Sequence, residues 1–241
     1  MRAVVMAGGR GTRMLPYTTV LPKPLLPVGE RPILAILLEQ LAAVGTTRID
    51  LCVGYLGELI RAYLLETPLL LGDTEVVLHT ESKPLGTAGA LHEIPALDEP
   101  FLSLNGDVLT SLDFGALMRD HRESGAALTV AVQSHETEIG SGVLELDGSR
   151  VTAYVEKPVL THLVSLGIYA LDPRALEHLP AGRVDVPTLV AKLLTAGEHV
   201  HAYRFDGHWY DIGTLTDHEA AEIELSANPE RYMPGAEPQS Q

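Results

Sequence analysis

A loop with three glycines near the start of the chain, residues 8–11, is the first place where residue types and spacing indicate chemistry. The loop follows a short apolar run, residues 3–6, that is typical of a buried strand. Glycines leave the backbone N–H groups of a loop unshielded, so such a turn can form a nest for an anion. Arg13 and Lys23 supply cationic groups for the same anion. We therefore predict a nucleoside triphosphate site after the first strand of an α/β domain.

The spacing of the loop excludes two common phosphate-binding motifs. A dinucleotide-binding fingerprint needs glycine or alanine at the position of Met14. A P-loop needs Gly-Lys-Ser or Gly-Lys-Thr, and this chain has Gly11-Thr12-Arg13 instead. A glycine-rich loop alone is also compatible with a tight turn that binds nothing, so its role depends on the sequence that follows.

Asp107 lies at the carboxyl end of a predicted strand, residues 101–104. Open α/β sheets place their ligands at this end of their strands. Magnesium prefers hard oxygen ligands and commonly uses one or two carboxylates together with substrate phosphates. Taken alone, an aspartate at this position is more often a turn or capping residue than a metal ligand.

The continuation of the glycine-rich loop resembles a family signature. GGRGTRMLPYT at 8–18, followed by LPKPLLPV at 21–28, is similar to the signature of sugar-1-phosphate nucleotidyltransferases, the nucleoside-diphosphate-sugar pyrophosphorylases. Five further motifs follow in the family order: PLGTAG at 84–89, NGDV at 105–108, VEKP at 155–158, GIY at 167–169 and WYDIG at 209–213. The resemblance covers about residues 1–213.

The resemblance implies a reaction and a nucleotide site. Members of the family transfer a nucleoside monophosphate from an NTP to a sugar-1-phosphate and release pyrophosphate. By resemblance, Arg13 holds the departing pyrophosphate, Lys23 bridges phosphates, and Asp107 acts with them in catalysis. Asp107 and Asp211 are the pair expected to hold Mg²⁺ as cofactor. The implied nucleotide-binding residues are Gly8, Gly9, Gly11, Thr12, Arg13, Lys23, Glu81, Gly86 and Thr87.

The sugar side of the site is expected in the second half of the chain. By resemblance, Lys157 meets the sugar phosphate, Glu156 accepts hydrogen bonds from sugar hydroxyls, and Gly142 lets the backbone approach the sugar. Ser165 stands where the family often has asparagine. Serine is shorter and offers a hydroxyl in place of an amide, so the hydrogen bonds to the sugar must differ. Which sugar is bound therefore stays open.

The segment ESKPLGTAGAL, residues 81–91, resembles the guanylyltransferases that make GDP-mannose or GDP-heptose. Guanine presents N1–H and N2–H donors, which the carboxylate of Glu81 can accept. Uracil and thymine present an edge that suits an amide better. GTP is therefore the favoured donor, with dTTP, UTP, CTP and ATP as alternatives.

Two other functions compete with this interpretation. A glycosyltransferase of similar fold would need a DxD motif, and the NGD segment ending at Asp107 supplies only its last aspartate. A non-catalytic, sugar-nucleotide-sensing regulator would not need to keep the phosphate and metal residues. The retention of those residues together favours the enzyme.

The order of elements predicts the fold class. The first half alternates strands at 48–53, 75–80 and 101–104 with helices at 33–44, 57–66 and 86–93. The second half adds strands at 128–133, 162–171, 200–205 and 209–212, a hairpin at 142–146 and 151–155, and helices at 174–177, 186–195 and 215–225. This pattern predicts an α/β, Rossmann-like (glycosyltransferase-A-like) fold whose mixed, mainly parallel sheet is flanked by helices, with a smaller sugar-binding β subregion.

The predicted domain organisation is one nucleotidyltransferase domain, residues 1–226. It comprises a nucleotide-binding half, about 1–125, and a sugar-binding half, 126–226. The Pro-rich polar segment 227–241 is expected to be a flexible tail.

Composition limits the partners and the location. With 17 Lys and Arg against 32 Asp and Glu, the formal charge is -15, which argues against nucleic-acid or anionic-membrane binding. The single cysteine, Cys52, lies in an apolar run and is expected in the core of a cytoplasmic protein. No signal peptide or membrane span is recognisable. The expected partners are an NTP and a sugar-1-phosphate, and association into a homo-oligomer is common among members of the family.

Overall fold

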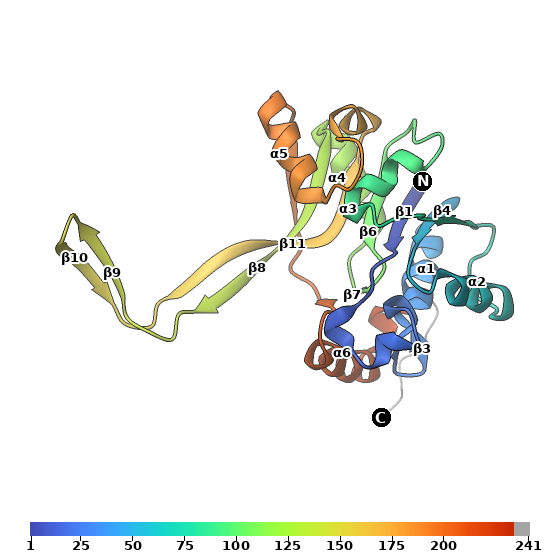
Figure 1. Cartoon of the computed structure of the whole chain (residues 1–241), viewed down its shortest axis with the longest axis horizontal. Helices are drawn as coiled ribbons and strands as arrows, with labels where there is room; N and C mark the ends of the chain where they lie inside the picture. Colours follow the sequence, from blue (N-terminus) through green and yellow to red (C-terminus); the bar gives the residue numbers. More distant parts are fainter. Residues whose placement is uncertain (234–241) are drawn as a thin grey trace.

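A seven-stranded sheet forms the centre of the molecule in the computed structural model, which describes residues 1–233 (Figure 1). Its spatial order is β12-β8-β11-β6-β1-β4-β5. The strands are β1 Arg2–Ala7, β4 Arg48–Val53, β5 Glu75–Thr80, β6 Phe101–Asn105, β8 Leu128–Glu138, β11 Val159–Leu171 and β12 Val200–Arg204. β11 is antiparallel to β6 and β8, and the other neighbours pair in parallel. The predicted mixed, mainly parallel sheet is confirmed.

Helices cover both faces of this sheet. One face packs against α1 Ile33–Ala43, α2 Gly57–Glu66 and α4 Phe114–Ser124, and the other against α3 Gly86–Gly89 and α5 Val186–Ala196. Successive strand residues point to opposite faces, so Val5 of β1 joins the first core cluster and Val4 joins the second. Within residues 1–233, none of the helices has the length and apolar character needed to cross a membrane.

A third, smaller core cluster lies beside the sheet. It contains α6 Leu215–Ala227 and the two-stranded pairs β2 Pro27–Val28 with β3 Arg31–Pro32 and β7 Val108–Thr110 with β13 Trp209–Asp211. The predicted tail, 227–241, begins at the last residue of α6. Tyr232 within it is buried in this cluster and donates to Glu224 Oε1 at 3.0 Å. Residues 234–241 lie outside the described part of the chain.

β8 and β11 extend beyond the sheet as a two-stranded ribbon that ends in the hairpin of β9 Val143–Asp147 and β10 Arg150–Val155. We call residues 134–163 the arm. Figure 1 shows it projecting away from the body of the molecule. No residue of the arm, all of which the structure describes, is buried. The hairpin was predicted, but the extension of both strands into an arm was not.

One helix, α4, was not predicted. Its signals are present in the sequence: Asp113 caps its first turn by accepting from Ala116 N at 2.9 Å, and Gly125 ends it in a left-handed conformation. Its buried residues, Phe114, Leu117, Met118 and His121, have helical spacing.

Cys52 lies on β4 and is 1% exposed. Burial raises the pKa of its thiol to about 12. The predicted core position of this residue is confirmed.

Candidate active site

Lys23, Asp107 and Asp211 come together although their motifs are far apart in the sequence. Asp107 lies in the turn between β6 and β7, and Asp211 ends β13. The pairing of β13 with β7 sets Asp211 opposite Val108, and Ile212 N donates to the carbonyl of Asp107 at 3.2 Å. Lys23 is almost buried; its Nζ pairs with Asp107 and lies 3.9 Å from Asp211 Oδ1. Two carboxylates therefore share one ammonium group.

The carboxylates of Asp107 and Asp211 repel each other, and this repulsion favours the binding of a cation between them. Burial raises the pKa of Asp211, and the charge of Asp107 raises it further, while Lys23 and Arg13 act in the opposite direction. Two carboxylates so placed suit Mg²⁺, which completes its shell with water and phosphate oxygens. Among residues 1–233 no cluster of three or more His, Cys, Asp or Glu side chains could enclose a metal ion. The donor set thus fits a metal held jointly with a substrate.

Arg13 and the end of the glycine-rich loop lie beside this group. Gly11 has a φ of +59°, and a Cβ built on it would lie 3.1 Å from Lys23 Cβ. Thr12 and Arg13 follow in a single exposed 3₁₀ turn. The guanidinium of Arg13 packs on Gly213, where an added Cβ would lie 3.0 Å from Arg13 Nη2. The first and last signature motifs therefore meet in space.

A cavity of about 450 Å³ opens beside the carboxylate pair. It contains six of the predicted site residues: Gly8, Gly9, Glu81, Gly86, Thr87 and Asp107. Four further polar residues line it that were not assigned a role from the sequence: Arg10, Asn105, Arg183 and Asp185. The cavity is large enough for part of a nucleotide and is bounded by the residues expected to bind one.

Glu81 is held against the glycine-rich loop. Its Oε2 accepts from Leu85 N at 3.2 Å, and a Cβ built on Gly8 would lie 3.3 Å from its Oε1. Burial raises the pKa of Glu81, and the charge of Glu93 adds to this, while the hydrogen bond from Leu85 lowers it. A half-buried carboxyl with this environment favours a ligand that donates hydrogen bonds to it.

Asp185 fixes the opposite wall of the cavity. Its Oδ1 accepts from Thr87 N at 3.0 Å and from Thr87 Oγ1 at 3.4 Å. Gly86 approaches the same segment so closely, with a φ of +79°, that a Cβ would lie 2.5 Å from Val184 O. The sequence marks Asp185 as the residue before a helix with an early proline, but nothing local indicates that it faces Thr87.

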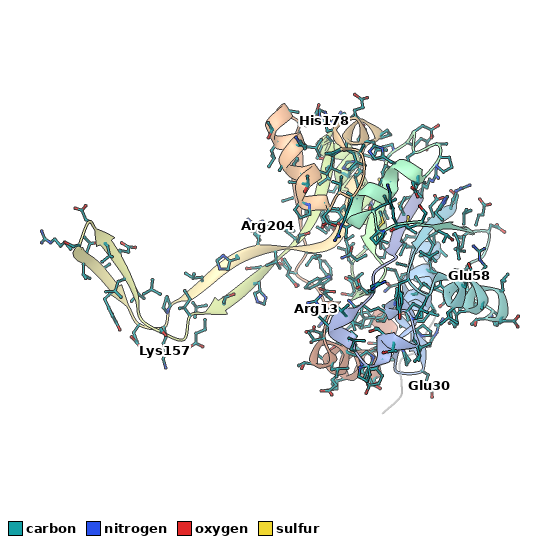
Figure 2. The ribbon with its side chains drawn as sticks, in the orientation of Figure 1. Arg13, Glu30, Glu58, Lys157, His178 and Arg204 are labelled. Atoms are coloured by element: carbon teal, nitrogen blue, oxygen red, sulfur yellow. The ribbon has the colours of Figure 1, made fainter. Side chains whose placement is uncertain are left out.

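The predicted sugar-phosphate residues are not gathered with Arg13 and Lys23. Ser165 is exposed at the base of the arm, where its Oγ lies 3.1 Å from Tyr169 Oη. Gly142, Glu156 and Lys157 are carried by the arm itself. Figure 2 shows Lys157 far along the arm and Arg13 on the body of the molecule. The sugar-binding roles of these four residues stay a prediction.

Comparison with known proteins identifies the family. The chain matches the family described as Nucleotidyl transferase over residues 2–227. This chain belongs to the nucleotidyl transferase family. A mannose-1-phosphate guanyltransferase from Yarrowia lipolytica is 32% identical over 251 residues, covering 99% of this chain and 69% of that protein. A UTP–glucose-1-phosphate uridylyltransferase from Synechocystis is 32% identical over 244 residues, covering 90% of this chain and 61% of that protein. The family predicted from the signature motifs is confirmed.

Solved structures agree with this nucleotidyl transferase fold. HddC from Yersinia pseudotuberculosis is 25% identical with a TM-score of 0.70, covering 93% of this chain and 99% of that chain. The same protein complexed with GMP-PN is 26% identical with a TM-score of 0.69 and the same coverage. A putative glucose-1-phosphate thymidylyltransferase from Bacillus anthracis has a TM-score of 0.74 at 22% identity, covers 98% of each chain, and supports the fold alone.

Proposed function

We propose that this nucleotidyl transferase transfers a nucleoside monophosphate, preferably GMP, from an NTP to a sugar-1-phosphate. The observation that carries the proposal is the meeting of Lys23 with Asp107 and Asp211 at the edge of the glycine-lined cavity. A cation, two carboxylates able to bind a metal ion and a cavity that accepts part of a nucleotide are what phosphoryl transfer between two phosphate substrates requires.

The reaction requires that the protein position the two substrates and neutralise the charge of their phosphates. An oxygen of the sugar phosphate attacks the α-phosphorus, and a new P–O bond forms there. The bond from the α-phosphorus to the oxygen bridging to the β-phosphate breaks, and its electron pair leaves on pyrophosphate. Lys23 neutralises charge near the reacting phosphate, and Arg13 holds the leaving pyrophosphate. No covalent intermediate with the protein is needed.

Asp107 and Asp211 are proposed to hold Mg²⁺. When bound, the ion neutralises phosphate charge that the two protein cations cannot balance alone. Lys23 keeps the two carboxylates together and remains available to a phosphate oxygen. The raised pKa of Asp211 supports this role, because a nearby dication would relieve the repulsion between the carboxylates.

GTP is the proposed donor because of Glu81. Its half-buried carboxyl faces the cavity and suits the N1–H and N2–H donors of guanine. The naming of the Yarrowia relative as a guanyltransferase and the complex of HddC with GMP-PN support this choice. The uridylyltransferase relative makes UTP the second candidate. We further propose a cytoplasmic location, in keeping with the single buried cysteine.

The deciding experiment is a matrix of five NTPs against several sugar-1-phosphates with Mg²⁺, followed by pyrophosphate release. We expect turnover with GTP and at least one sugar-1-phosphate, and loss of turnover in Asp107→Ala. Folded protein that releases no pyrophosphate in any combination would favour the non-catalytic sensing function, which binding of a sugar nucleotide would then reveal.

A further inference from the structure

The arm exposes apolar side chains on both of its faces. In the β9–β10 hairpin Leu144 pairs with Tyr154 and Val143 pairs with Val155. Cross-strand partners share a face and neighbouring residues alternate, so the two pairs lie on opposite faces. Tyr154 is 62% exposed and Leu144 48%. A two-stranded ribbon is marginal by itself in water, and exposed apolar surface of this extent indicates a binding surface.

A polar elbow, residues 156–158, joins the ribbon to this hairpin. Ile139 N donates to Pro158 O at 3.0 Å, which closes the ribbon, and Tyr154 Oη donates to Glu156 Oε2 at 2.7 Å. Lys157 has a φ of +44°, a left-handed conformation that is rare for residues other than glycine and is commonest at functional sites. The elbow therefore presents an acceptor held by Tyr154, Glu156, beside an exposed cation, Lys157.

The body of the molecule has an exposed surface beside the cavity against which an arm could pack. No residue of the arm is among those lining the cavity beside Asp107. Next to Arg13, three large apolar side chains, Leu15, Tyr17 and Val20, are 57%, 54% and 68% exposed. Two exposed arginines, Arg10 and Arg183, border the cavity and could receive acidic side chains of an arm, although Glu81, Asp107 and Asp185 line the same cavity. The arm and the surface next to Arg13 thus both expose large apolar side chains that could cover one another.

We propose that two copies of this chain exchange arms, so that Glu156 and Lys157 of each copy complete the active site of the other. This inference rests on the proposed function, because it assigns these two residues to the sugar phosphate. A second copy fits better than any other occupant, since one two-fold exchange covers both arms and both acceptor surfaces at once. Each active site is then built from two chains.

The oligomeric state of the full chain tests the exchange without reference to activity. Light scattering after gel filtration should show a dimer for the wild type. The double variant Leu144→Glu, Tyr154→Glu should be monomeric with an unchanged far-UV circular dichroism spectrum. The matched control Leu65→Glu alters a 78% exposed leucine of α2 and should stay dimeric. A monomeric wild type, or a dimeric arm variant, overturns the exchange.

A tandem-purified heterodimer tests the shared site. One chain carries Asp107→Ala and the other Lys157→Ala, each of which we expect to be inactive as a homodimer. If the arm acts in trans, the heterodimer has one intact site and one doubly altered site, so it should regain about half of the wild-type turnover. If the arm acts within its own chain, both sites carry one substitution and the heterodimer stays inactive.

The outcomes separate this inference from the proposed function. An active wild type with an inactive heterodimer overturns the sharing of sites and leaves the function standing. An inactive wild type overturns the function and the sugar-phosphate role of Lys157, and the gel-filtration result still decides whether arms are exchanged.

Discussion

At the scale of single residues, the site stores repulsion between two carboxylates. Asp107 and Asp211 belong to different strands, yet one ammonium group, that of Lys23, serves both. Such an arrangement lowers the stability of the free protein. It becomes useful when a metal ion neutralises the two carboxylates, or when a substrate phosphate pairs with the ammonium group of Lys23. A substitution that removes one of the two carboxylate charges should therefore raise the free energy of unfolding and lower the activity.

Replacing Asp211 by asparagine should stabilise the protein and impair turnover. A carboxyl whose pKa is raised by folding binds its proton more tightly in the folded state, so its charge destabilises the fold at neutral pH. Asp211→Asn should raise the Tm at pH 7, and the gain should shrink as the pH falls through the raised pKa of folded Asp211 and vanish below the ordinary value of 3.8. Differential scanning calorimetry at several pH values measures this.

The same melts test the metal assignment. Mg²⁺ should raise the Tm of the wild type, because it binds the folded state only, and should have much less effect on Asp211→Asn. Asp98→Asn, at an exposed position away from the cavity, is the control and should keep both the Mg²⁺ response and the wild-type Tm. A variant that still responds fully to Mg²⁺ would remove Asp211 from the proposed metal pair.

Glu81 should control the choice of base. In Glu81→Gln the acceptor for the guanine N1–H and N2–H donors is weakened, so the ratio of kcat/KM for GTP over UTP should fall by about tenfold or more. Steady-state kinetics with both nucleotides gives the ratio directly. Glu93→Gln, which changes a neighbouring exposed carboxylate outside the cavity, should leave the ratio unchanged. An unaltered ratio in Glu81→Gln would exclude guanine recognition by this residue.

At the scale of elements, the cavity wall depends on the fit of α3 against the segment before α5. Ala88 N and Gly89 N both donate to Val184 O, at 2.9 and 3.0 Å, and Gly86 leaves room for that carbonyl. Gly86→Ala should lower the free energy of unfolding by about 1–3 kcal/mol and raise the KM for the NTP, because the wall must shift. Urea denaturation and nucleotide kinetics check the two effects.

Gly125→Ala provides the matched control for this change. Gly125 also has a positive φ, +62°, but a Cβ added there would meet no atom within 4 Å. Its substitution should cost only the backbone strain and leave the KM for the NTP unchanged. If both variants behave alike, the close approach of Gly86 to Val184 is not what holds the cavity wall.

The elements themselves were largely predictable. β4, β5 and α2 have the predicted bounds, because apolar periodicity and local stop signals define them. Six residues predicted for the site line one cavity, and their motifs could be found in the sequence because each is contiguous; their binding roles stay a prediction. The contact between Thr87 and Asp185 was not, because the two lie 98 positions apart and neither segment shows in its local sequence that it meets the other.

At the scale of the whole molecule, the arm shows which structural features local sequence signals do not predict. The β9–β10 hairpin was predicted, because Asp147-Gly148 between two strand-like runs is a strong hairpin signal. The length of β8 and β11 depends on the pairing of Glu138 with Val159, which no local signal specifies. A pattern of strands also does not show whether the apolar side chains of those strands pack against their own chain or against another. The position of Lys157 relative to Arg13 could therefore be learned only from the structure.

The burial of Cys52 makes the chain a convenient host for spectroscopic probes. A thiol that is 1% exposed and has a pKa of about 12 carries almost no thiolate at neutral pH and reacts slowly with maleimides. The chain has no other cysteine. A single cysteine introduced at an exposed position, such as Asp147 at the hairpin tip, would therefore accept a spin label or fluorophore selectively without prior removal of native thiols.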